Sequence, residues 1–337
     1  MTGGRRRSSL LFGEEERQLG LFEDRDRDAP DASGQLQVDL EAIRKRLPPK
    51  LRLGTSSWTF PGWAGLVYHR RYPSQRAFLR ESLAEYAKHP LMRTVGIDRG
   101  YYAPVPEDDL ALYASQLPPD FRAAIKVWQR VTMPGYPRHP RYGADAGKQN
   151  PDFLNPQIFA SAVNEPVRSA FGRHMGPWIL EIAPSPHPID PSWFGERLDA
   201  FLHQAPRDFP FAVELRDRKL LSSEYARILR RHGASHVFNY WSRMPTLAEQ
   251  MKIEGLLGGP LLVVRLLLPP GTRYAELKEA YAPFDRIVAP QTSMRQDVVR
   301  LVRAALDRDV EAYVLVNNKA EGSSPWTVRA LAEQLAG

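Results

Sequence analysis

The amino-acid sequence predicts a closed barrel of eight parallel strands joined by helices, the TIM-type (β/α)8 fold. Short apolar runs of strand length alternate with stretches of helical spacing, which is typical of βα units in a parallel sheet. The runs number about eight, the number of strands that closes such a barrel. An open, doubly wound sheet is the alternative. It has less support, because no Gly-x-Gly-x-x-Gly follows the first run.

Each expected element follows from this alternation. The strands are expected at 51–57, 94–98, 122–127, 178–182, 211–214, 235–239, 261–267 and 311–316. The helices are expected at 75–88, 107–116, 156–171, 191–204, 222–232, 246–254, 275–281, 292–307 and 325–335. Residues 129–155 are rich in Pro, Gly, Tyr and His, which predicts a long loop. Its part 130–148 concentrates Arg, His, Tyr and Gly, which suits a flexible lid, an arm that grips phosphate, or a solvated insertion.

Residues 1–50 are expected to precede the barrel as a tail. The first 35 or so are dense in charge, which is typical of disorder. Residues 36–47 have helical spacing and end at two prolines, which fits a short helix or a linker. The apolar stretch 10–12 is too short for a signal peptide, and no run approaches the ~18 apolar residues of a membrane span. We therefore expect a cytoplasmic protein with a single barrel domain over 51–337 and no membrane segment.

Composition limits the chemistry. The 337 residues include 46 basic and 39 acidic ones, a formal net charge of +7, and no cysteine. The lack of cysteine excludes disulfides, thiolate nucleophiles and cysteine zinc sites. The eight histidines show no metal-binding spacing, so no metal ligands are predicted, and the cofactor stays open, a divalent metal included. The positive charge is compatible with an anionic small molecule or nucleic acid as partner but does not require one. The oligomeric state is not predicted.

Charged residues stand at the C-terminal ends of successive strands, and in a TIM-type barrel these ends converge on the mouth where active sites lie. Lys126, Glu181 and Glu214 are the candidate catalytic residues. A lysine there can bind phosphate, act as a base or form an imine, and two carboxylates on neighbouring strands suit acid–base work. The alternative is that these groups form structural ion pairs with one another and with Arg216 or Arg265.

Further residues at strand ends are candidates for substrate binding, because aromatic rings stack on sugars and bases while polar groups hydrogen-bond them. They are Trp58, Asp98, Tyr101, Arg216, Asn239, Tyr240, Arg265, Asn317 and Asn318. The alternative for the short polar residues is turn formation, and for the aromatic residues it is packing between loops.

Five segments resemble motifs of the YecE-like proteins, the domain of unknown function 72. The first is Gly-Thr-Ser-Ser-Trp-Thr-Phe-Pro-Gly-Trp-Ala-Gly at 54–65. The others are Phe-Arg-Ala-Ala-Ile-Lys at 121–126, Gly-Pro-Trp-Ile-Leu-Glu-Ile-Ala-Pro at 176–184, Ala-Val-Glu-Leu-Arg at 212–216 and Tyr-Val-Leu-Val-Asn-Asn at 313–318. The resemblance spans residue 51 to the C-terminus and implies a TIM-type barrel similar to the endonuclease IV-like group. The second strand ends in Asp98 without the family's usual glutamate, so we expect a divergent member.

Three functions fit these residues. The first is an enzyme, a hydrolase or lyase, acting on a phosphorylated or nucleic-acid-like substrate at the mouth. Lys126, Arg216 and Arg265 would hold the anion, while Glu181 and Glu214 transfer protons. The second is a carbohydrate-active barrel that uses the two glutamates. The third is a nucleic-acid-binding protein without catalysis.

Overall fold

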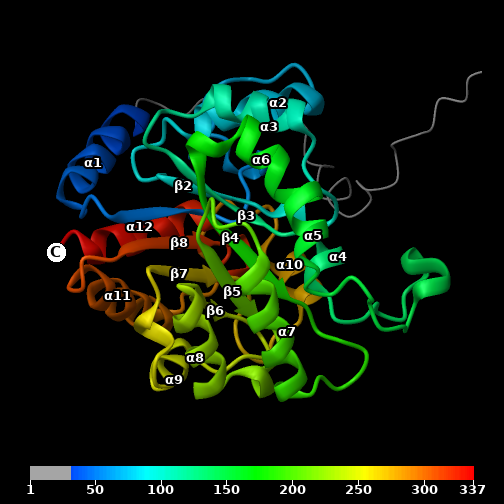
Figure 1. The fold of residues 1–337 in the computed structure, drawn as a ribbon. Helices are drawn as coiled ribbons and strands as arrows, with labels where there is room; N and C mark the ends of the chain where they lie inside the picture. The colour runs from blue at the N-terminus through cyan, green and yellow to red at the C-terminus, as the bar shows by residue number, and fades with distance from the viewer. Residues whose placement is uncertain (1–31) are drawn as a thin grey trace, which may run out of the picture.

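The chain folds into a closed barrel of eight parallel strands in chain order, which confirms the predicted fold class (Figure 1). A computed structural model describes residues 32–337, with side chains from residue 39. The strands are β1 Leu51–Thr55, β2 Thr94–Ile97, β3 Arg122–Lys126, β4 Met175–Ile182, β5 Phe211–Leu215, β6 Ser235–Tyr240, β7 Leu261–Leu266 and β8 Glu311–Val316. β8 pairs with β1 and closes the ring.

Helices surround the strands (Figure 1). They are α1 Ala32–Arg46, α2 Gln75–Tyr86, α3 Glu107–Gln116, α4 Gln129–Thr132, α5 Pro156–Ile158, α6 Glu165–Ala170, α7 Pro191–Gln204, α8 Ser223–His232, α9 Leu247–Met251, α10 Tyr274–Tyr281, α11 Thr292–Leu306 and α12 Ser324–Leu335. Capping side chains and a glycine in the left-handed region define several helix ends. The side chains of Ser74 and Asp190 accept hydrogen bonds from the first turns of α2 and α7, and Gly233 ends α8 at a φ of 63°.

The structure differs from the sequence prediction in two helical segments. The single helix expected at 156–171 is continuous, but its middle, Phe159–Asn164, is wound as a π-helix between α5 and α6. The expected loop 129–155 contains α4 and a 3₁₀ turn at Pro140–Asp145. The buried Asn150 side chain orders this loop, because it donates to the carbonyls of Arg130 and Met133 at 2.8 Å each.

The N-terminal part of the expected tail lies outside the described residues, up to residue 31. From residue 32 the chain is helical, as the spacing of residues 36–47 suggested. This helix, α1, packs against α12 and buries Leu40, Ile43 and Leu47. No helix within residues 32–337 is both long and apolar enough to cross a membrane.

The barrel interior is a small apolar layer of its own, separate from the larger core between strands and helices. It consists of Ala124, Ile179, Ala212, Val237, Val263, Tyr313 and Leu315. On the side of β1 and β2, glycines stand at the strand positions that approach each other, Gly54 in β1 and Gly96 in β2. A Cβ on Gly54 would overlap the carbonyl of Thr94, and one on Gly96 would lie 2.6 Å from the carbonyl of Ser56. Glycine there lets β1 and β2 approach at hydrogen-bonding distance.

We predict that Gly54→Ala destabilises the fold strongly, because the added methyl group can only be placed by moving β1 away from β2. Overpacking of this kind costs about 1–3 kcal/mol or more. Gly172→Ala is the matched control, since its Cβ would meet its nearest neighbour at an ordinary 3.6 Å. Urea unfolding of both variants measures the difference. Equal stability of the two variants would contradict the close approach of the strands.

Candidate active site at the barrel mouth

Strand alternation builds a polar layer directly above the apolar interior. Side chains two residues apart in a strand point to the same side, so the residues two positions after the apolar layer also face inward. They are Lys126, Glu181, Glu214, Asn239, Arg265 and Asn317. Glu181 and Glu214 are direct partners in the β4–β5 register, and Asn239 and Arg265 are partners between β6 and β7. The sequence placed these residues at one mouth, and the structure brings them together there.

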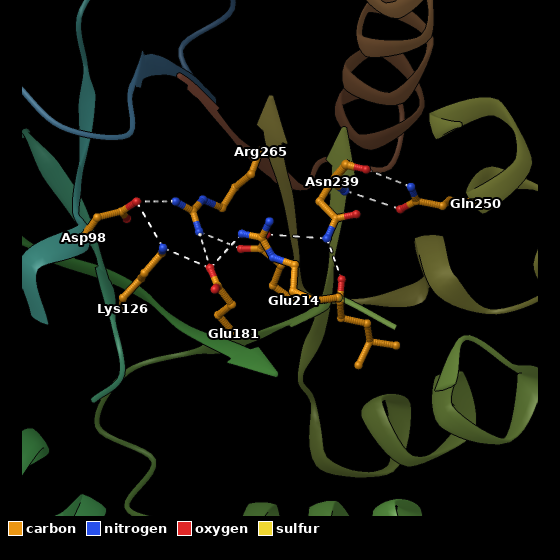
Figure 2. Close-up of polar contacts among 9 residues, drawn as sticks. Asp98, Lys126, Glu181, Glu214, Asn239, Gln250 and Arg265 are labelled. Carbon is orange, nitrogen blue, oxygen red and sulfur yellow. Dashed lines mark hydrogen bonds and ion pairs between the residues drawn. The ribbon is translucent and has the colours of Figure 1, made fainter. Parts of the chain in front are cut away.

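Six charged side chains form one ion network, here called the mouth network (Figure 2). Its members are Asp98, Lys126, Glu181, Glu214, Arg216 and Arg265. Lys126 lies between two carboxylates, with its Nζ 2.9 Å from Glu181 and 3.2 Å from Asp98. The network joins the ends of strands β2, β3, β4, β5 and β7, so residues far apart in the sequence depend on one another.

The two arginines complete the network. Arg265 contacts Asp98 and Glu214 at 2.6 Å each, on opposite sides of its guanidinium. Arg216 contacts Glu181 at 2.7 Å and Glu214 at 2.6 Å, and its guanidinium lies 4.2 Å from the ring centroid of Trp241. Three cations therefore face three carboxylates, and the network as a whole is neutral. The structural ion pairs that the sequence predicted as the alternative to catalytic roles are present in the structure.

Burial separates an inner and an outer part of the network. The side chains of Glu214 and Arg265 are 0% exposed, whereas those of Lys126 and Glu181 are 12% exposed and that of Asp98 is 28% exposed. Glu214 and Arg265 thus stabilise the layer from within, because an unpaired charge at that depth would be very costly. Lys126, Glu181, Asp98 and the 4% exposed Arg216 are the members that line the pocket above and that a bound molecule can touch.

The network holds its ionised state firmly. Burial alone would raise the pKa of the Glu181 carboxyl, but the cations around it, Arg216 first, outweigh burial and hold that pKa well below its ordinary value of 4.5. Burial alone would also lower the pKa of Arg265. The carboxylates of Asp98 and Glu214 outweigh this effect and raise its pKa above the ordinary value. Glu181 is therefore a carboxylate at neutral pH and not a proton donor.

Two amide side chains, those of Asn239 and Gln250, hold part of the polar layer in place through hydrogen bonds. Asn239 donates to the carbonyl of Leu215 at 2.7 Å and, more weakly, to Glu214 at 3.5 Å. Gln250 of α9 bonds both backbone groups of Asn239, accepting at 3.3 Å and donating at 2.9 Å (Figure 2). His236 lies behind Gln250, and burial lowers its pKa to about 4. These contacts fix the orientation of Asn239, whose side chain stays buried.

A pocket of ≈ 710 Å³ opens above the network, a size that suits a small-molecule ligand. Its lining includes six of the predicted site residues, namely Trp58, Asp98, Lys126, Glu181, Arg216 and Asn317. The other six, Tyr101, Glu214, Asn239, Tyr240, Arg265 and Asn318, do not line this mouth pocket.

The predicted residues outside the lining have structural partners. Tyr101 lies beneath Lys126, with its ring centroid 5.3 Å from Nζ. Tyr240 donates to Gln291 at 3.0 Å. Asn318 is buried and accepts from Trp63 and from the backbone of Ser324, whereas its neighbour Asn317 faces the pocket. The assignment of Tyr101, Tyr240 and Asn318 to substrate binding therefore stays a prediction, and their positions in the structure do not support it.

Four cations of the mouth pocket were not predicted: Arg99, which pairs with Asp109 at 2.6 Å, and three others. Arg76 and Arg80 stand one helical turn apart on α2, exposed at the rim, and Lys319 follows the two asparagines after β8. Within the described side chains, none of the three forms an ion pair with a carboxylate. The i, i+4 spacing of the arginines on the first helix of the barrel was the available signal. Lys319 gave a weaker one, because it lies beyond the strand end.

The predicted loop 129–155 does not contribute to the mouth pocket as the structure describes it. Its residues Arg130 and Lys148 instead line a second cavity of ≈ 760 Å³ together with Arg197 of α7. Among the described side chains, no cluster of three or more His, Asp or Glu residues is placed to hold a metal ion.

The fold and its mouth define a TIM-type barrel with a charged pocket at the C-terminal ends of its strands. The chain belongs to the DUF72 family, whose model, described as a protein of unknown function, matches residues 52–337. This confirms the resemblance found in the sequence motifs.

Two solved DUF72 proteins share the fold. One, from Enterococcus faecalis V583, is 16% identical, with 85% of this chain and 95% of that chain covered and a TM-score of 0.58. The other, from Thermotoga maritima MSB8, is 19% identical, with 85% and 99% covered and a TM-score of 0.55. Identities this low establish a common architecture and no common activity. No curated protein matches the chain.

We predict that Arg265→Met lowers the free energy of unfolding by about 3–5 kcal/mol, because it leaves Glu214 buried with half of its ion pairing lost. Arg227→Met is the control. Arg227 pairs with Glu224 on the exposed face of α8, where solvent screens the pair and its loss should change stability little. Urea unfolding of both variants measures the difference. A loss below ~1 kcal/mol for the Arg265 variant would show that the pairing is not needed for stability.

The lowered pKa of Glu181 predicts a specific acid sensitivity. Its unfolded state takes up a proton near 4.5 while the folded state stays ionised, so its ion pairs stabilise the protein above that pH and are lost as pH falls. The stability of the wild type should therefore fall more steeply below about pH 5 than that of Glu181→Gln. Melting temperatures against pH measure this, with Glu165→Gln at an exposed ion pair as control. Parallel curves for wild type and Glu181→Gln would refute the assignment.

Proposed function

We propose that this protein is an enzyme, a hydrolase or lyase, that acts on a small phosphorylated or nucleotide-like substrate in the mouth pocket. The charge of the pocket is the observation that supports it. The lining carries six cations, Arg76, Arg80, Arg99, Lys126, Arg216 and Lys319, against three carboxylates, Asp98, Asp109 and Glu181, an excess of three. Since the mouth network is neutral and Arg99 pairs with Asp109 at 2.6 Å, the excess belongs to Arg76, Arg80 and Lys319. Positive charge at a concave site attracts anions.

The remaining walls suit a planar group beside the anion. Aromatic residues of the lining come from loops after the strands and from helices α3 and α10: Trp58, Phe60, Tyr102, Tyr113, Trp241 and Tyr274. Stacking on such rings contributes about 1–3 kcal/mol per base. A phosphate ester that carries a ring would thus find both of its parts matched.

Proton transfer in this proposal belongs to the Lys126–Glu181 pair. The ammonium of Lys126 is the accessible donor, and the carboxylate of Glu181, 2.9 Å away, holds it in place. Glu214 and Arg265 do not touch the substrate. They are positioning residues that hold Arg216 and Asp98, which revises the direct roles expected for them from the sequence.

The carbohydrate-active alternative has weaker support. A glycosidase of that kind needs one carboxyl that stays protonated near neutral pH. The pKa of Glu181 is lowered and not raised, and Glu214 has no access to the pocket. Binding of nucleic acid without catalysis shares the charge argument and is separated by the experiment below.

We predict that the Arg76→Ala, Arg80→Ala double variant binds adenosine monophosphate and pyrophosphate about twofold to thirtyfold more weakly than the wild type, since each exposed charge contributes about 0.2–1 kcal/mol. Isothermal titration calorimetry at low and moderate salt measures this. Arg303→Ala on α11, an exposed arginine away from the mouth pocket, is the control. Unchanged affinity in the double variant would refute anion binding at this rim.

Turnover is tested in the same preparations with a panel of phosphate monoesters and mononucleotides. Lys126→Met should lower kcat by about 10²–10⁴-fold while binding is retained. Tight binding of single-stranded oligonucleotides with no turnover on the panel would instead favour the non-enzymatic alternative.

A further inference from the structure

Lys319 occupies an unusual position at the mouth. It lies in the 3₁₀ turn Asn318–Ala320 directly after β8, is 2% exposed, and lines the mouth pocket. The Asn317 side chain accepts its backbone N–H at 3.1 Å, which fixes the turn. Its ammonium nitrogen lies 4.3 Å from the ring centroid of Tyr274 and 5.4 Å from that of Phe284. The lysine is therefore held against aromatic walls at the edge of the cavity.

Its surroundings differ from those of the other lysine in the pocket. Lys126 touches two carboxylates, whereas Lys319 forms no ion pair with a carboxylate among the described side chains. Lys278 of α10 is the charged group that acts on it most, and it brings a like charge. Burial first, and the like charge of Lys278 second, lower the pKa of Lys319 to about 8. About a tenth of the amine is thus neutral and nucleophilic at pH 7, and about half of it at pH 8.

We propose that Lys319 forms an imine with an aldehyde or ketone group of the substrate. The neutral amine adds to the carbonyl carbon, so that a C–N bond forms and the carbonyl electron pair moves to oxygen. The carbinolamine then expels this oxygen as water, which carries away the two hydrogens of the amine. The resulting C=N bond, once protonated, draws electrons from a neighbouring bond of the substrate and thereby weakens it.

This inference rests on the proposed function, because the same pocket must hold the substrate, and it narrows that function. It selects a lyase over a hydrolase, and an anionic carbonyl compound as the substrate class. The rim arginines Arg76 and Arg80 would then hold the anionic group while Lys319 takes the carbonyl. Lys126 stays the proton donor of the neighbouring network.

The test traps the imine in the wild-type protein. Pyridoxal 5′-phosphate, which has both an aldehyde and a phosphate, and neutral pyridoxal are each added, followed by borohydride, which reduces the imine to a stable amine. Peptide mass spectrometry then locates the label, so the result does not depend on whether a variant folds. We expect Lys319 to be labelled with half-maximal rate near pH 8, roughly two orders of magnitude faster at that pH than an exposed lysine of ordinary pKa.

The exposed Lys252 serves as the internal reference, and Lys319→Arg and Lys252→Arg are the matched variants. Labelling of Lys319 no faster than of Lys252 by both aldehydes overturns the imine proposal. Competition by inorganic phosphate tests the proposed function separately. If pyridoxal labels Lys319 but phosphate does not slow labelling by pyridoxal 5′-phosphate, anion binding fails and the imine proposal stands. If phosphate binds but neither aldehyde reacts at Lys319, the reverse holds.

Discussion

The guanidinium of Arg265 is the contact on which the mouth of this barrel depends. It is fully buried, and it reaches from β7 across the interior to Asp98 after β2 and to Glu214 on β5. A buried charge is tolerated only when its partners are placed well. The other ion pairs follow from this one, because Glu214 in turn positions Arg216, and Asp98 positions Lys126. The positions of the accessible charged groups in the pocket therefore depend on Arg265, a residue that no ligand can touch.

The mouth network at the centre of the pocket is neutral, whereas the rim and wall of the pocket carry positive charge that is unpaired among the described side chains. The mouth network satisfies its own charges, so a substrate does not have to compete with the carboxylates to be attracted. In the proposed function, attraction of the substrate belongs to Arg76 and Arg80 at the surface and to Lys319 at the wall. The proposed function thereby divides binding and proton transfer between different residues. For the proposed reaction, a preorganised polar centre of this kind would need no rearrangement.

Much of the fold followed from the sequence, because a barrel strand is short, apolar and bounded. The strand at 311–316 and the helices at 107–116 and 191–204 were predicted to the residue. The convergence of Lys126, Glu181 and Glu214 also followed, since strand ends of a barrel share one mouth. The depth at which each of these side chains is buried did not follow from the sequence. Whether a side chain such as Glu214 reaches the cavity depends on the layers stacked above it, which a single strand does not reveal.

Residues beyond the strand ends were the hardest to assign. Asn317 and Asn318 are neighbours in sequence, yet one faces the pocket and the other turns toward Trp63, because a 3₁₀ turn begins between them. Lys319 was missed for the same reason. Its surroundings include Tyr274 and Lys278, which lie about forty residues earlier in the chain and approach only when α10 folds over the mouth.

The ladder of the barrel is shortest at two places. β1 pairs with β2 through Gly54 and Thr55, and β5 pairs with β6 through Ala212 and Val213, whereas β7 and β8 pair along their whole length. These two seams stand opposite each other and divide the ring into the halves β2–β5 and β6–β1. Arg265 belongs to one half, and both of its 2.6 Å partners belong to the other. The same ion pairs that shape the pocket thus act as a cross-brace between two half-barrels.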